Sequence, residues 1–106
     1  MIVADFFKSK SDRLVGFRIT GHAGFGEYGH DVACASVSSA VMMAANTITE
    51  AFKIKADVIV DENEISVKLV SDDEGQGDKV ILGLLTHMYF LSEDYTGSIK
   101  VKVIDI

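Results

Sequence analysis

The chain has one cysteine, few basic residues and no long apolar run among its 106 residues. A single cysteine cannot form an internal disulfide, which fits a reducing compartment. Ten basic against sixteen acidic residues give a formal net charge of −6, which argues against a nucleic-acid binder because phosphate contacts need a basic surface. A membrane-spanning helix needs about 18 or more apolar residues in succession, so we expect none. The first apolar run lacks the charged leader of a signal peptide.

The length and an apolar fraction of 48% indicate one domain, residues 1–106, with a core of its own. Apolar spacings of three and four predict helices over 32–52 and 73–93. Short apolar or alternating segments predict five strands, at 2–7, 15–20, 56–60, 65–69 and 99–103. The order ββαββαβ predicts an α+β two-layer sandwich with both helices on one face of a mixed five-stranded sheet. The sequence leaves the order of the strands in that sheet open.

Two histidines and the only cysteine lie within thirteen residues, at His22, His30 and Cys34. Asp31 is a good N-cap for the helix that follows, which would put Cys34 in its first turn. Free amides and the helix dipole favour a thiolate there, and such a thiol reacts at neutral pH. Cys34 also falls on the apolar line of the helix, so a packed and inert thiol is the alternative interpretation.

His22 is the candidate base for that thiol. It stands at the end of an expected strand, and the eleven residues between it and Cys34 are enough to fold back onto the helix start. His30 is its competitor, and an exposed loop histidine is the alternative interpretation of His22. Asp31 caps the helix, orients His22, or does both.

The segment between His22 and the helix is rich in glycine, which permits positive φ and close backbone approach. We expect this loop to contact substrate or to act as a mobile lid, and a flexible surface loop is the alternative. The residues concerned are Gly24, Phe25, Gly26, Glu27, Tyr28 and Gly29.

A metal-binding module using His22, His30 and Cys34 is a further alternative. Structural zinc usually takes four ligands with closer pairing, such as Cys-x-x-Cys. We therefore expect neither a metal nor another cofactor.

The whole loop is similar to a known signature. Gly21-His22-Ala23, followed by Gly29-His30-Asp31-Val32-Ala33-Cys34-Ala35 and Ser38, resembles the motif of the Prp family, the ribosomal-processing cysteine proteases of bacteria. The resemblance extends in length and element order over essentially the whole chain. It implies that Cys34 is the nucleophile and His22 its base. For the oxyanion, thiol-protease chemistry suggests amides at the helix start, with Ala33 and Cys34 as candidates.

The resemblance also implies a substrate and an assembly. The substrate would be the N-terminal extension of large-subunit ribosomal protein twenty-seven, cut after a pair of phenylalanines. The protein would be a cytoplasmic homodimer that contacts neither nucleic acid nor a membrane. A non-catalytic ribosome-associated binding protein remains the alternative, although retention of both His22 and Cys34 counts against it.

Overall fold

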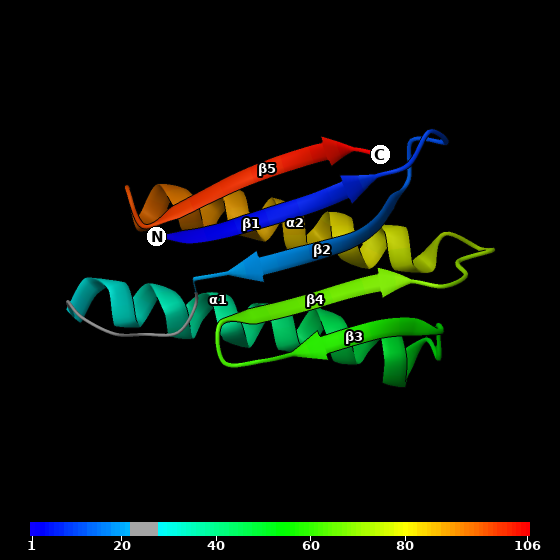
Figure 1. Ribbon diagram of the computed structural model, residues 1–106, viewed down its shortest axis with the longest axis horizontal. Helices are drawn as coiled ribbons and strands as arrows, with labels where there is room; N and C mark the ends of the chain where they lie inside the picture. Colours follow the sequence, from blue (N-terminus) through cyan, green and yellow to red (C-terminus); the bar gives the residue numbers. More distant parts are fainter. Residues whose placement is uncertain (22–27) are drawn as a thin grey trace.

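The computed structural model describes residues 1–21 and 28–106, with the backbone alone described for 28–31. Figure 1 shows the elements along the chain. They are β1 (Ile2–Lys8), β2 (Leu14–Thr20), α1 (Tyr28–Asn46), a π-helical turn η1 (Thr47–Ala51), β3 (Ala56–Val60), β4 (Glu64–Leu69), α2 (Gln76–Asp94) and β5 (Ile99–Asp105). The predicted order ββαββαβ is confirmed.

The five strands form one mixed sheet in the order β3-β4-β2-β1-β5. β1 is antiparallel to β2 and parallel to β5, so the first and last strands of the chain lie side by side (Figure 1), with Ile2 opposite Ile99. β4 is antiparallel to both β2 and β3. The two hairpins are thus joined edge to edge through β2 and β4.

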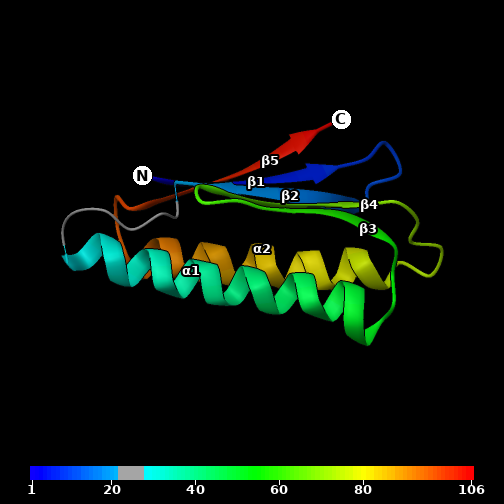
Figure 2. The same ribbon diagram turned by 60° about the horizontal axis from the view of Figure 1, so that its bottom comes forward.

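Both helices cover the same face of the sheet (Figure 2), as predicted. The core lies between the helices and the sheet. Strand side chains that point toward the helices are fully buried there, among them Phe6, Phe17 and Ile19. The rings of Phe6 and Phe17 lie 6.1 Å apart on neighbouring strands. Complete burial of one such side chain contributes about 1.5–3 kcal/mol.

The first helix begins earlier than its cap chemistry predicts. α1 starts at Tyr28, so Asp31 lies inside the helix and the prediction that it is the N-cap is wrong. A helical glycine costs only about 1 kcal/mol relative to alanine, so Gly29 does not stop the helix. Cys34 comes six residues after the first helical residue and lies in the second turn rather than the first. The predicted end near Phe52 agrees with the π-helical turn that follows Asn46.

The second helix starts slightly later than predicted, at Gln76 instead of Asp73. Gly75 immediately precedes it with φ of 75°, a left-handed conformation that favours glycine. The Asp72 carboxylate accepts hydrogen bonds of 2.9 Å from the backbone N–H groups of Gly77 and Asp78. Asp72 therefore satisfies amides of the first turn from outside the helix.

Among the described residues, the segment Val32–Ala51 is long and apolar enough to cross a membrane by length and composition alone. This is weak evidence, because the core helix of a soluble protein passes the same test, and 39% of its apolar window is buried inside the protein. The expectation that the chain does not contact a membrane stays a prediction.

Candidate active site

Cys34 lies on the side of α1 that packs into the core. Only 4% of its surface is exposed, and Val37 and Val41, farther along the same helix, are fully buried. Its Sγ donates a hydrogen bond of 3.8 Å to the carbonyl oxygen of Gly21, thirteen residues earlier in the chain. The thiol is therefore anchored to the end of the β2 segment, where the glycine-rich loop begins.

Gly21 is held in place by two other parts of the backbone. Its φ is 78°, and a Cβ at this position would overlap the carbonyl oxygen of Met1. Its N–H donates to the carbonyl oxygen of Asn63, in the turn between β3 and β4, at 3.3 Å. Both the left-handed conformation and the close approach require glycine. The backbone of Gly21 is thus fixed beside the sulfur of Cys34.

Gly21 and Asn63 were not among the residues predicted for the site. Gly21 had a sequence signal, because it is the first residue of the Gly-His-Ala motif. Asn63 had none beyond its place in an expected hairpin turn. Their role depends on contacts between segments about twenty and forty residues apart, which local spacing does not reveal.

Several predicted site residues fall outside what the structure describes. The candidate base His22 lies outside the described residues, as do Gly24, Phe25, Gly26 and Glu27. Tyr28 and Gly29 belong to the first turn of α1, and His30 and Asp31 follow in the same helix, with side chains that are not described. The roles predicted for these side chains stay predictions.

The amides proposed for an oxyanion hole are affected by the early start of α1. Ala33 is fully buried, and both it and Cys34 follow more than four helical residues. An α-helix pairs the N–H of each such residue with the carbonyl four positions earlier. The unpaired N–H groups of α1 are those of its first four residues, 28–31, so the start of α1 at Tyr28 counts against Ala33 and Cys34 as oxyanion donors.

No group of three or more His, Cys, Asp or Glu side chains in the described part of the chain is placed to hold a metal ion. His22 and His30 lie outside that part, so the metal-binding alternative is not tested by the geometry. At the far end of the sheet, a hydrogen bond to Asp12 and the charges of Asp12 and Asp105 raise the pKa of Lys8. Lys8 ends β1 at the end of the sheet away from Gly21 (Figure 1).

The sequence places a histidine directly after Gly21, and a thiol held at this point suits a cysteine protease. The family model for cysteine protease Prp matches residues 1–100. The chain therefore belongs to the Prp family of cysteine proteases, as the resemblance of its motif predicts.

Two relatives illustrate the similarity along the sequence. The ribosomal processing cysteine protease Prp of Staphylococcus aureus is 24% identical over 104 residues, which covers 96% of this chain and 98% of that protein. The protein of the same name from Bacillus subtilis is 27% identical over 107 residues, with coverage of 95% and 96%.

Solved structures show the same fold. A protein of Streptococcus mutans superimposes with a TM-score of 0.91 at 26% identity and covers 100% of this chain and 96% of its own. The essential ribosomal processing protease Prp from Staphylococcus aureus, in complex with a substrate peptide, gives a TM-score of 0.90 at 22% identity, with coverage of 98% and 100%. The two-layer α+β architecture is therefore that of the family.

Proposed function

We propose that this protease removes the N-terminal extension of large-subunit ribosomal protein twenty-seven, with Cys34 as the nucleophile and His22 as its base. The observation that carries the assignment of the residues is the hydrogen bond from Cys34 to Gly21, the residue directly before His22. The names of the relatives support the substrate class, since both are ribosomal processing proteases. A further Staphylococcus aureus structure holds a covalently linked product peptide.

The proposed reaction proceeds by acyl transfer through the thiol. His22 takes the proton of Cys34, and the thiolate attacks the scissile carbonyl carbon, so that a C–S bond forms and the carbonyl oxygen becomes an oxyanion. The free N–H groups of the first turn of α1 are the donors proposed for that oxyanion. His22 then gives its proton to the leaving amine as the C–N bond breaks. Water hydrolyses the thioester and restores the thiol.

Burial suits this role once the peptide is bound. A thiol that is 4% exposed in the free protein is shielded from competing solutes, and a shielded site strengthens the charge interactions that stabilise the oxyanion. Because Cys34 is almost fully buried, the substrate has to displace neighbouring groups before its scissile carbonyl can reach the sulfur. The substrate-contacting role predicted for the segment Gly24–Gly29 is one part of this proposal.

The remaining expectations belong to the same proposal. We propose one domain over residues 1–106 that acts in the cytoplasm as a homodimer and takes no metal or other cofactor. Its partner is a peptide of a ribosomal protein rather than nucleic acid. The net charge of −6 supports a basic peptide over an anionic polymer.

The test is to incubate the protein with the ribosomal protein carrying its N-terminal extension and to measure the masses of the products. We expect one cut after the aromatic pair and none with the Cys34→Ala variant. A ribosomal protein made without its extension is the control substrate and should stay intact. No cleavage by the native protein, or equal cleavage by Cys34→Ala, would refute the proposal.

A further inference from the structure

The sheet ends on one side at β3, and no other strand in the described part of the chain pairs with its outer edge. Natural edge strands are usually protected from further pairing by lysine, proline or a bulge. β3 contains neither residue, and its register with β4 has no shift. The strand at the opposite edge, β5, carries Lys100 and Lys102. β3 is therefore the edge of this sheet that is open to another strand.

The backbone of β3 presents alternate residues to its open edge. Just beyond the strand, the N–H of Asp61 donates a hydrogen bond of 2.9 Å to the carbonyl oxygen of Glu64. In an antiparallel pair, positions bonded to the partner alternate with positions whose N–H and C=O groups point away from it. β3 therefore bonds to β4 at its odd-numbered residues. The backbone groups of Ala56, Val58 and Val60 point outward.

Two valines of the same strand are exposed on the side of the sheet that carries the helices. Val58 lies opposite Val67, and Val60 lies opposite Ile65. Opposite residues share a face of the sheet, and these two partners belong to the core. Val58 and Val60 are nevertheless 41% and 61% exposed, so the helices leave this strip uncovered. We call these two side chains and the outward backbone groups of Ala56, Val58 and Val60 the β3 edge.

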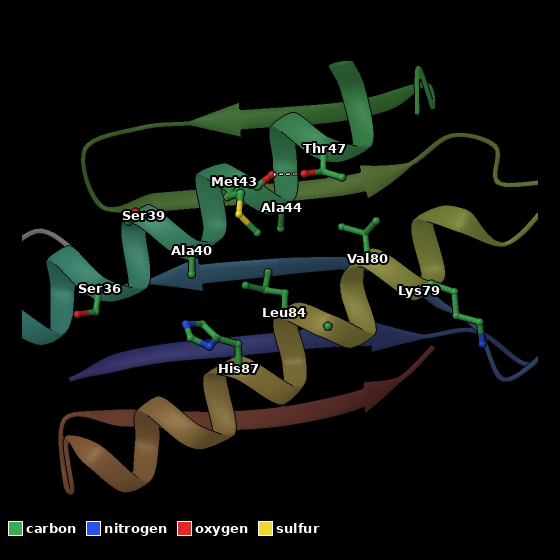
Figure 3. A pocket seen from close by; sticks show the side chains of 11 residues that line it. Ser36, Ser39, Ala40, Met43, Ala44, Thr47, Lys79, Val80, Leu84 and His87 are labelled. Carbon is green, nitrogen blue, oxygen red and sulfur yellow. Dashed lines mark hydrogen bonds between the residues drawn. The ribbon is translucent and has the colours of Figure 1, made fainter. Parts of the chain in front are cut away.

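Another apolar surface lies between the helices, away from the thiol. A groove of about 720 Å³ runs between α1 and α2. Figure 3 shows Met43 leaning from α1 toward α2, with Leu84 opposite and His87 farther along α2. Cys34 does not line this groove, and no lining residue belongs to β3. The groove therefore offers a peptide no contact next to the sulfur.

The β3 edge, in contrast, leads to the thiol. β3 runs toward the turn that contains Asn63 (Figure 1), whose carbonyl oxygen accepts from Gly21, and Gly21 accepts from Cys34. Only β4 separates β3 from β2, and neighbouring strands lie about 4.8 Å apart. The end of β3 is thus about 10 Å from the end of β2, a distance that about three extended residues span.

We infer that the segment of the substrate before the cut binds the β3 edge as an additional strand, parallel to β3, with alternate apolar side chains on Val58 and Val60. The inference rests on the proposed function, because the occupant is the peptide substrate of the protease. Main-chain hydrogen bonds give such an added strand its affinity, and alternate side chains give it specificity. A strand that runs in the direction of β3 brings its carboxyl end to the thiol, as a cut after the bound segment requires.

This arrangement fixes which parts of the peptide contact the β3 edge. The apolar valines suit the residues before the cut, which end in two phenylalanines, better than the basic residues after it. About three residues cross from the thiol to β3, so pairing starts at about the fourth residue before the cut. Only alternate residues of an added strand direct their N–H groups toward β3. Binding should therefore depend on every second backbone N–H, a pattern that side-chain contacts alone do not produce.

The test measures peptide binding by fluorescence anisotropy with the Cys34→Ala protein, so that cleavage is not needed. The probe is a labelled synthetic peptide in which alternating valine and serine precede two phenylalanines, with lysines after the cut. One backbone nitrogen at a time is methylated, from the third to the seventh residue before the cut. We expect the Kd to rise at least about fivefold at alternate positions and less than about twofold between them, since each methyl group removes one hydrogen-bond donor.

Matched variants test the protein side of the same contact. Val58→Pro removes an outward N–H without removing a bond to β4, whereas Val58→Ala keeps that N–H and shortens the side chain. Val58→Pro should raise the Kd at least about twofold more than Val58→Ala. Val60→Ser should also weaken binding, because it removes apolar contact. Ile59→Ser should not, since Ile59 is 51% exposed on the opposite face of the same strand.

Several outcomes would overturn the inference. These are a peptide that does not bind, methylation effects without a period of two, and equal losses in Val60→Ser and Ile59→Ser. Equal Kd values for folded Val58→Pro and Val58→Ala would do the same, and if the proline variant does not fold, the methylated peptides decide. Cleavage of the ribosomal protein without periodic binding would refute this inference alone. Periodic binding without cleavage would support it and refute the proposed function.

Discussion

The sulfur of Cys34 donates its 3.8 Å hydrogen bond to the carbonyl oxygen of Gly21 and thereby ties the second turn of α1 to the residue that follows β2. Gly21 cannot relax away from this contact, because Met1 lies against it on one side and Asn63 holds its N–H on the other. The position of the thiol relative to the start of the loop is therefore set by four segments of the chain. This arrangement gives the first prediction.

Replacement of Gly21 by alanine should damage both folding and cleavage. The new Cβ would be strained at a φ of 78° and would overlap the Met1 carbonyl, so we expect a loss of stability of at least about 1–3 kcal/mol. Denaturant unfolding measures this loss. Gly97→Ala is the control, because Gly97 has a φ of 84° but no atom within 4 Å of a new Cβ.

The two variants separate strain from displacement of the site. Both variants carry the cost of an alanine at positive φ. When kcat/KM is measured at a temperature where each variant is fully folded, only Gly21→Ala should have a lowered value. Equal kcat/KM values for the two folded variants would show that the contact between Gly21 and Met1 does not position the site.

Much of the fold was predictable because its signals are local. Alternation at Phe17 and Ile19 and helical spacing at Val37 and Val41 depend on residues close in sequence, and the structure buries all four. The strand order was not predictable, because the parallel pairing of β1 with β5 joins the two ends of the chain. Nothing near Ile2 indicates that its neighbour in the sheet is Ile99.

The site was predictable in identity but not in geometry. The motif placed Cys34 and Gly21 in one family signature, and the structure brings these two together. The helix start was misplaced because Asp31 has ideal cap chemistry, whereas the hydrogen-bonded turns extend upstream to Tyr28. The preference of aspartate for the N-cap position is a weak local signal, and tertiary context routinely overrides signals of this kind.

Cys34→Ala should abolish cleavage while the fold survives. The side chain is buried among the small and aliphatic residues of α1, and its loss leaves a small void and removes one weak hydrogen bond. We expect a loss of stability on the order of 1 kcal/mol, seen as a small shift of the denaturation midpoint. Retained cleavage would remove the mechanism, and a chain that no longer folds would instead support a purely structural cysteine.

His22→Ala should change how the reactivity of Cys34 depends on pH. If His22 is the base, its removal shifts the rise in the alkylation rate toward higher pH and lowers the rate near neutrality. The readout is the rate of iodoacetamide labelling followed by mass measurement. His87→Ala is the control, since His87 lies in the groove on α2, and its profile should match the native one. Identical profiles for all three proteins would exclude His22 as the base.

Asp72→Ala should destabilise the protein without impairing the chemistry. The carboxylate accepts from the N–H groups of Gly77 and Asp78 at the start of α2, and loss of such a cap costs about 0.5–2 kcal/mol. Thermal unfolding measures the cost. Asp73→Ala, at the next position but with an exposed side chain, should have little effect. A comparable loss in both variants would mean that the cap bonds contribute nothing.

The last prediction concerns the residues on either side of the cut. A peptide with two phenylalanines before the cut and basic residues after it should be cleaved, and replacement of both phenylalanines by alanine should lower kcat/KM by well over about tenfold, since each aromatic buries roughly 150–250 Å². Asp61 and Glu62 are exposed in the turn whose Asn63 accepts a hydrogen bond from Gly21, so we expect a basic segment of the substrate to meet their charges.

Salt separates these two contributions. Exposed charges are screened over about 10 Å at 0.1 M ionic strength, whereas an apolar pocket is not. Raising salt should therefore weaken cleavage of the basic peptide moderately, and Asp61→Asn should reduce that salt dependence. Asp57→Asn, on β3 away from this turn, is the matched control and should leave it unchanged. If the phenylalanine and alanine peptides are cleaved equally well, the specificity expected from the family does not hold for this chain, even with Cys34 as the nucleophile.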